Sequence, residues 1–151
     1  MTELSTLPNG RILLDALMLT PEMLQVLPKV PIPAPALRAL LKAVISQVPF
    51  DENFYATTYP DLAQAKESGA IADLRTHFLD HGYFEGRLGA EPEVDEEFYK
   101  EMYPDVAAAI TRGDIRSASD HYMRAGGAEG RFANPAQMQA CRQWQEILGD
   151  R

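Results

Sequence analysis

The chain has 151 residues, a length typical of one domain, and its apolar (46%) and charged (24%) contents are those of a globular protein. The net charge of −8 disfavours nucleic acid and anionic membranes as partners. The single cysteine, Cys141, excludes an intrachain disulfide framework and a multi-cysteine metal site. No apolar run approaches the ~18 residues of a membrane span. The start lacks a basic and then apolar stretch, so we expect a cytoplasmic protein without a signal peptide, with surface exposure by a non-classical route left open.

The charge is unevenly distributed along the chain. Residues 1–47 carry a net charge of +1, residues 48–135 carry −9, and residues 136–151 are neutral. An acidic centre keeps a small protein soluble, and its field also attracts cationic partners. The sequence therefore predicts an acidic body between two more apolar ends.

The N-terminal 48 residues predict three helices. Residues 11–19 are an apolar-rich helix candidate, and Thr20 is placed to cap a short second helix with Pro21 at its first position. A third helix is expected over residues 36–48. The prolines between the second and third helices predict a stiff, extended bridge, and they are Pro28, Pro31, Pro33 and Pro35.

The helix expected over residues 36–48 has a stripe of large apolar residues, with Arg38 and Lys42 on the opposite face. Burying each large side chain is worth roughly 1.5–3 kcal/mol, so a stripe left in water is costly. We expect an exposed patch that docks on a protein partner or on a second copy. The alternative is that the stripe completes the core. The expected docking residues are Leu37, Leu40, Leu41, Val44 and Ile45.

An internal repeat with an offset of 44 residues dominates the rest of the chain. Phe-Asp-Glu-Asn-Phe-Tyr, starting at Phe50, returns as Val-Asp-Glu-Glu-Phe-Tyr, starting at Val94. Of the 38 positions compared without a gap, 16 are identical. Two copies of one supersecondary unit follow, which we place at residues 49–92 and 93–135.

Each copy predicts three short helices. In the first copy, Asp51 caps the first helix, Pro60 starts the second, and Gly69 ends it as a left-handed residue. The third helix starts at Asp73, and Gly82 is expected to end it with a positive φ. The second copy has counterparts 44 residues later. The third helix has a face expected to be buried, formed by Leu74, His77, Phe78 and His81, or by Ala118, His121, Tyr122 and Ala125.

A last helix is expected over residues 136–148, carrying Trp144, Ile147 and Leu148. No alternating β-branched run predicts a strand. The expected fold is therefore all-α, with two tandem repeats of about 44 residues. Because two repeats are fewer than a repeat array usually needs, we expect the N-terminal and C-terminal helices to cap them and close the core.

The repeat pattern, Phe-Asp-x-x-x-Tyr, Tyr-Pro-Asp-Leu/Val-Ala, Gly, His-Phe/Tyr and Gly-x-x-Glu-Gly-Arg, resembles modules of bacterial glycosyltransferases and surface-polysaccharide proteins. The resemblance covers about 86 residues, from Phe50 to Pro135. In such proteins the module usually sits beside a separate catalytic domain. The resemblance therefore implies an accessory role around cell-surface glycans and supplies no active site.

Polar and aromatic residues that recur in both copies are the candidate ligand-binding groups. Tyrosine has an apolar face and a polar tip, so it can serve as a sugar platform. The alternative assigns these tyrosines and histidines to the core and the Glu-Gly-Arg charges to structural ion pairs. The candidate glycan-binding residues are Tyr55, Tyr59, His77, Arg87, Tyr99, Tyr103, His121 and Arg131.

The sequence gives little support for metal binding or catalysis. His77 and His81 have the i, i+4 spacing of zinc ligands, but the second copy has Ala125 in place of His81. There is neither a glycine-rich phosphate loop nor a Gly-x-Ser-x-Gly elbow. We expect no cofactor and no enzymatic activity. Two functions remain: a non-catalytic protein-interaction module associated with bacterial surface-polysaccharide machinery, or a glycan-binding adhesion module.

Overall fold

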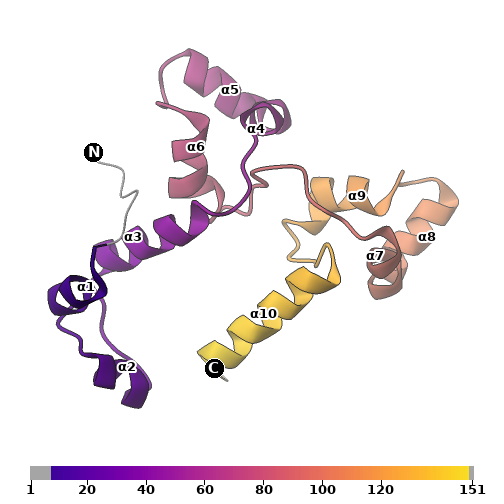
Figure 1. Cartoon of the computed structure of the whole chain (residues 1–151). Coiled ribbons are helices and arrows are strands. Elements are labelled where there is room, and N and C mark those ends of the chain that lie inside the picture. The colour runs from indigo at the N-terminus through magenta and orange to yellow at the C-terminus, as the bar shows by residue number, and fades with distance from the viewer. Residues whose placement is uncertain (1–7, 150–151) are drawn as a thin grey trace. The chain divides into compact units, whose positions relative to one another are not determined.

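The computed structural model describes residues 8–149, and over this range the fold is all-helical without a strand (Figure 1). The chain divides into two compact units, an N-terminal unit (Met1–Pro49) and a C-terminal unit (Phe50–Arg151). The start of the chain, on which the expectation about a signal peptide rests, lies outside the described residues. Within the described range, no helix combines the length and the apolar content needed to cross a bilayer.

The N-terminal unit contains helices α1 (Gly10–Ala16), α2 (Pro21–Val26) and α3 (Ala34–Ile45). The Thr20 hydroxyl accepts a hydrogen bond from the Met23 N–H at 3.2 Å, so the predicted cap of α2 is confirmed. Helix α3 begins two residues earlier than expected. Pro35 belongs to its first turn, where the missing N–H of proline would have no helical partner in any case.

A strained residue, Met18, follows the end of helix α1. Met18 has a φ of +56°, the left-handed conformation that usually belongs to glycine. The Leu19 N–H donates to the Leu14 carbonyl at 2.9 Å, and the Met18 N–H donates to the Asp15 carbonyl at 3.0 Å. This is the hydrogen-bond pattern of a Schellman cap. It turns the chain so that Leu19 is buried while Met18 is 85% exposed.

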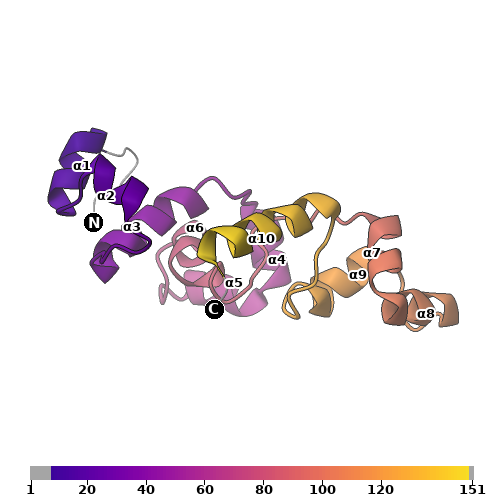
Figure 2. The ribbon, with the colours of Figure 1, turned by 90° about the horizontal axis from the view of Figure 1, so that it is seen from below.

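The C-terminal unit contains two helical segments with the same order of elements. The first segment (residues 50–89) has α4 (Glu52–Thr58), α5 (Pro60–Glu67), α6 (Leu74–His77) and a π-helical turn η1 (Phe78–Gly82). The second segment (residues 94–133) has α7 (Glu96–Met102), α8 (Pro104–Arg112), α9 (Ala118–His121) and a π-helical turn η2 (Tyr122–Gly126). Figures 1 and 2 show the short helices of each segment gathered around one another.

Local side-chain caps explain where most of these helices begin. Asp51 and Asp95 accept from the N–H groups of Phe54 and Phe98 at 2.9 and 3.0 Å. Asp73 caps α6 and Ser117 caps α9 in the same way. The left-handed glycines predicted after the second helices are present, because Gly69 and Gly113 have φ of +76° and +82°. These helix boundaries follow from local sequence.

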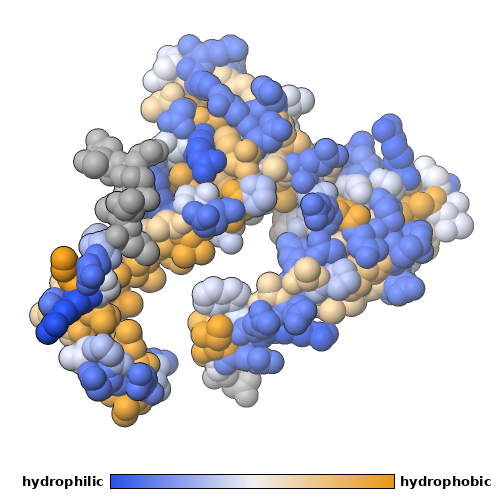
Figure 3. Space-filling view, in the orientation of Figure 1, coloured by the Kyte–Doolittle hydropathy of each residue, from blue (hydrophilic) through white to orange (hydrophobic). Residues whose placement is uncertain are grey.

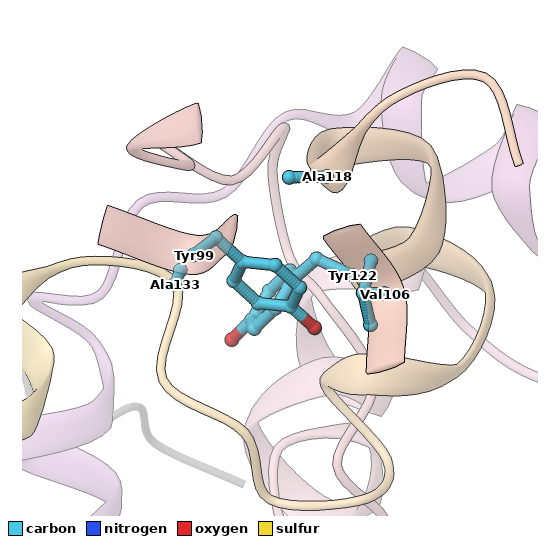
Figure 4. Close-up of a cluster of buried hydrophobic side chains, with 5 residues drawn as sticks. All are labelled: Tyr99, Val106, Ala118, Tyr122 and Ala133. Atoms are coloured by element: carbon cyan, nitrogen blue, oxygen red, sulfur yellow. The ribbon is translucent and has the colours of Figure 1, made fainter. Parts of the chain in front are cut away.

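The core of the second segment is a tight cluster of five residues, shown in Figure 4: Tyr99, Val106, Ala118, Tyr122 and Ala133. Partly buried residues pack around this cluster, and one of them, Leu88, comes from the first segment. In the first segment the corresponding residues Tyr55, Leu74 and Phe78 are at most 1% exposed. Both cores therefore form around a tyrosine of the segment's opening helix.

The C-terminal helix α10 (Pro135–Leu148) has no buried residue. Its first turn is tied to the second segment by polar contacts: the Gln137 side chain accepts the Ala133 N–H at 2.6 Å and contacts the Tyr122 hydroxyl. The expectation that this helix closes the core is not met, because Trp144, Ile147 and Leu148 are 61%, 73% and 59% exposed.

Candidate functional site

A buried tyrosine bonded to a histidine forms the centre of each segment. The Tyr55 hydroxyl lies 3.2 Å from His77 Nδ1, and the Tyr99 hydroxyl lies 3.0 Å from His121 Nδ1. Both tyrosines are 0% exposed, and burial raises the pKa of each phenol to about 12. Burial also lowers the pKa of His77. The pair satisfies the polar ends of two large side chains inside the segment.

A glycine closes the other side of each tyrosine hydroxyl. A Cβ added to Gly82 would lie 2.2 Å from the Tyr55 hydroxyl, and one added to Gly126 would lie 2.1 Å from the Tyr99 hydroxyl. Neither glycine has a positive φ, so the predicted left-handed ends at Gly82 and Gly126 are wrong. Glycine is needed there because the tyrosine approaches the backbone closely.

The arginine of each Glu-Gly-Arg motif stacks on the second tyrosine of its segment. The Arg87 and Arg131 guanidinium carbons each lie 4.8 Å from the ring centroid, of Tyr59 and Tyr103 respectively, within cation–π range. In the second segment, Arg131 also forms a bidentate pair with Asp105 at 3.1 and 2.9 Å. This pair lowers the pKa of the Asp105 carboxyl.

The equivalent arginine of the first segment is held more loosely. One Arg87 guanidinium nitrogen lies 3.7 Å from an Asp61 carboxylate oxygen, and the Arg87 Nε donates to Glu85 at 2.8 Å. Arg131 makes the corresponding bond to Glu129 at 2.6 Å in addition to its bidentate pair. The second segment therefore has the stronger ionic closure.

The same second tyrosine ties the end of each segment to its middle. The Tyr59 hydroxyl accepts the Leu88 N–H at 2.8 Å, and the Tyr103 hydroxyl accepts the Phe132 N–H at 2.7 Å. Backbone bonds then join start to end, from the Asp51 N–H to the Gly89 carbonyl at 2.9 Å and from the Asp95 N–H to the Ala133 carbonyl at 3.0 Å.

These contacts show what surrounds each of the eight candidate glycan-binding residues. Every one of them makes internal contacts: Tyr55, Tyr59, His77 and Arg87 in the first segment, and Tyr99, Tyr103, His121 and Arg131 in the second. Tyr55 and Tyr99 are buried and the other six are half-buried. None of the eight side chains is fully exposed.

The histidine pair considered for zinc is only partly buried. His81 is exposed rather than part of the buried face, although its ring centroid lies 5.7 Å from that of His77. In the described part of the chain, no three or more His, Cys, Asp and Glu side chains gather as a metal site would require.

A shallow hollow of about 550 Å³ lies beside the starts of α7 and α10. Two of its polar side chains already serve the backbone. Asp95 caps α7, while Asn134 caps α10 and donates to the Glu93 carbonyl at 2.8 Å. Both side chains are therefore engaged in holding the backbone around the hollow.

The predicted docking stripe on α3 divides into exposed and buried residues. Leu37, Leu41 and Val44 are 45%, 38% and 66% exposed, while Leu40 is half-buried. Ile45 is only 3% exposed, so its assignment as a docking residue is wrong and it belongs to the core. Apolar side chains along the N-terminal unit are visible in orange in Figure 3.

Two further exposed apolar features are not among the site residues predicted from the sequence. Tyr83 and Phe84 are 44% and 57% exposed and meet edge to face at a centroid distance of 5.6 Å. The second segment has Gly127 and Ala128 at the positions 44 residues later, and this difference is the only sequence signal for the pair. The second feature is the apolar side of α10.

Comparisons of the chain with protein-family models, with curated proteins and with solved structures find no match.

Proposed function

We propose that this chain is a non-catalytic protein-interaction module that docks through the exposed face of α3. The observation that carries the proposal is the row Leu37, Leu41 and Val44, spaced i, i+4 and i+7 on one helix and between 38% and 66% exposed. A row at this spacing is how an amphipathic helix presents anchors to a partner groove. Apolar side chains gathered in this way mark an interaction site.

The positive charge of α3 indicates which charges its partner would carry. The helix contains Arg38 and Lys42 and no acidic residue, and residues 8–49 carry four basic and two acidic side chains. A protein segment with an apolar face bordered by acidic residues would complement this surface. We therefore expect binding that weakens as salt is added.

We also propose that residues 50–133 are two copies of one repeat serving as the scaffold. The support is that the Tyr–His bond, the stacked arginine and the backbone closure each occur twice at an offset of 44 residues. The resemblance of the repeat pattern to modules of bacterial surface-polysaccharide proteins supports a partner in that machinery.

The test uses the whole chain with a photo-crosslinking amino acid at position 44 in the native cell, and at exposed Asn53 as the control position. We expect a protein adduct at position 44 that Leu41→Asp abolishes while circular dichroism stays unchanged. Ile45→Asp should instead unfold the N-terminal unit, because Ile45 is buried. An adduct that survives Leu41→Asp, or unfolding of Leu41→Asp itself, would overturn the α3 assignment.

Glycan binding is the second candidate, and one observation favours it. The exposed Tyr83–Phe84 pair offers two aromatic faces in the first segment only. A glycan array probed with the wild-type chain and with Phe84→Ala tests this role. Binding that Phe84→Ala removes would support it, and an array without any binding would leave the protein-interaction role alone.

A further inference from the structure

The apolar side of α10 is a second exposed surface, formed by other residues than the face of α3. We call the row Cys141, Trp144, Ile147 and Leu148 the α10 stripe. Trp144, Ile147 and Leu148 are 59–73% exposed, and Cys141 is half-buried. Figures 1 and 2 show α10 as one continuous straight helix. The helix is capped at both ends, by the Asn134 side chain and by the Gly149 N–H, which donates to the carbonyls of Gln145 and Glu146.

The charges of α10 lie away from this stripe. At roughly 100° per residue, Arg142 and Glu146 are each about 160° around the helix from Trp144. The residues about 100° to either side of Trp144 are Gln143 and Gln145. The stripe is thus bordered by uncharged amides, each of which both donates and accepts hydrogen bonds.

A surface of this kind is complementary to itself. A charged partner finds no opposite charge beside the stripe, whereas an identical helix brings a matching apolar row and matching amides. A face that pairs with its own copy across a two-fold axis forms a closed dimer. By contrast, two α3 faces would bring their arginines and lysines together. We propose that the α10 stripe pairs with the α10 stripe of a second copy of this chain.

The size of the stripe sets the strength of the dimer. The three large side chains expose on the order of 400 Å² per copy, taking roughly 150–250 Å² for a fully exposed side chain of this size. Two copies bury less than the ~1,200 Å² of a standard stable interface. The net charge of −8 on each copy also opposes association. The dimer is therefore reversible, forms at high concentration and strengthens with salt.

The test follows molecular mass and the emission of Trp144, the only tryptophan of the chain. Sedimentation of the full chain from about 10 μM to about 1 mM should show the mass rising from 16.8 kDa toward twice that value. The tryptophan emission should move to shorter wavelength over the same range. Ile147→Asp keeps Trp144 and should weaken association at least tenfold. Gln139→Asp, which adds the same charge about 140° from Trp144, should behave as wild type.

The lone thiol identifies the surface that is paired. A bis-maleimide should link Cys141 of one copy to Cys141 of another at dimer-forming concentrations, and Ile147→Asp should abolish this product. A wild-type chain that stays monomeric at about 1 mM would overturn the proposal. A dimer that Ile147→Asp leaves intact would also overturn the proposal. A dimer that Leu41→Asp removes would overturn it as well, because that dimer would form through the face of α3.

Discussion

The buried tyrosine of each segment is confined on two sides, by an imidazole and by a backbone glycine. The Tyr99 hydroxyl meets His121 at 3.0 Å and leaves no space for a side chain at Gly126. Because the ring is fully buried, it cannot swing away without disturbing the core around it. One oxygen atom therefore determines which residue type can occupy position 126.

We predict that Gly126→Ala lowers the free energy of unfolding by about 1–3 kcal/mol, the usual cost of overpacking. Gly127→Ala is the matched control, since its added Cβ would lie 3.5 Å from the nearest atom, an ordinary contact. Tyr99→Phe removes the obstructing oxygen, so combined with Gly126→Ala it should cost less than the sum of the two single changes. Denaturant unfolding of the four variants measures this coupling, and strict additivity would contradict it.

The second residue-scale prediction concerns alkaline pH. Burial raises the pKa of Tyr55 and Tyr99 to about 12 in the folded chain, against an ordinary value of 10.0. A raised folded pKa gives stability that is present below the unfolded pKa and is lost as the pH rises toward the folded pKa. Ionisation of each tyrosine should thus lower the free energy of unfolding by about 2 kcal/mol between pH 10 and pH 12. Unfolding free energies of Tyr99→Phe across this range should fall less steeply than those of wild type.

Residue-scale features were predictable from sequence where their cause is local. Thr20, Asp51 and Gly69 act through neighbours within a few residues, and their roles were predicted from the sequence. The requirement for glycine at position 82 could not be predicted in this way. The group that excludes a side chain there, the Tyr55 hydroxyl, comes from another helix. A close approach of this kind leaves no local pattern.

At the scale of elements, the end of α1 carries strain that one substitution relieves. A non-glycine residue in the left-handed region costs roughly 1–2 kcal/mol, and Met18 is exposed at φ +56°. Met18→Gly should stabilise the end of α1 by up to about 1 kcal/mol, after allowance for the greater freedom of glycine in the unfolded chain. Met18→Ala keeps the strain and should give no gain. Hydrogen exchange of the α1 amides measures the difference, and equal protection in both variants would contradict it.

The third helix of the first segment shows where helical periodicity misleads. A regular α-helix would place His81 on the same face as His77 and Phe78. The π-helical turn η1, with its bond from the Tyr83 N–H to the Phe78 carbonyl at 2.9 Å, widens the turn and rotates the later residues. His81 is therefore exposed. Sequence patterns based on 3.6 residues per turn cannot anticipate this shift.

At the scale of the whole molecule, the all-α class was predictable, but the amount of exposed apolar surface was not. The sequence shows which side of α3 and of α10 is apolar. Whether such a side is covered depends on what packs against it, and no local pattern records that. Ile45 is buried whereas its neighbour Val44 is 66% exposed. The same limit explains why the C-terminal helix was expected to close the core.

We predict that residues 50–151 fold without the N-terminal unit. The hydrogen bonds that close both segments, and those that hold the first turn of α10, lie entirely within this range. The fragment should keep its helical circular dichroism, and its free energy of unfolding should agree with that of the same unit in the full chain within about 0.5 kcal/mol. A fragment that is unfolded would show that the N-terminal unit is needed for the fold.

The backbone bonds from Asp51 to Gly89 and from Asp95 to Ala133 bring the two ends of each segment within about 3 Å of each other. A stretch of gene that encodes such a segment can be duplicated in frame without displacing the flanking chain, because the new copy begins where the old one ends. Leu88 and Phe132 are equivalent, because the N–H of each donates to the second tyrosine of its own segment. The Leu88 side chain also packs on the core of the second segment. Under the proposed repeat, the number of segments is a quantity that evolution or a protein engineer can vary, while the fold of each segment stays fixed.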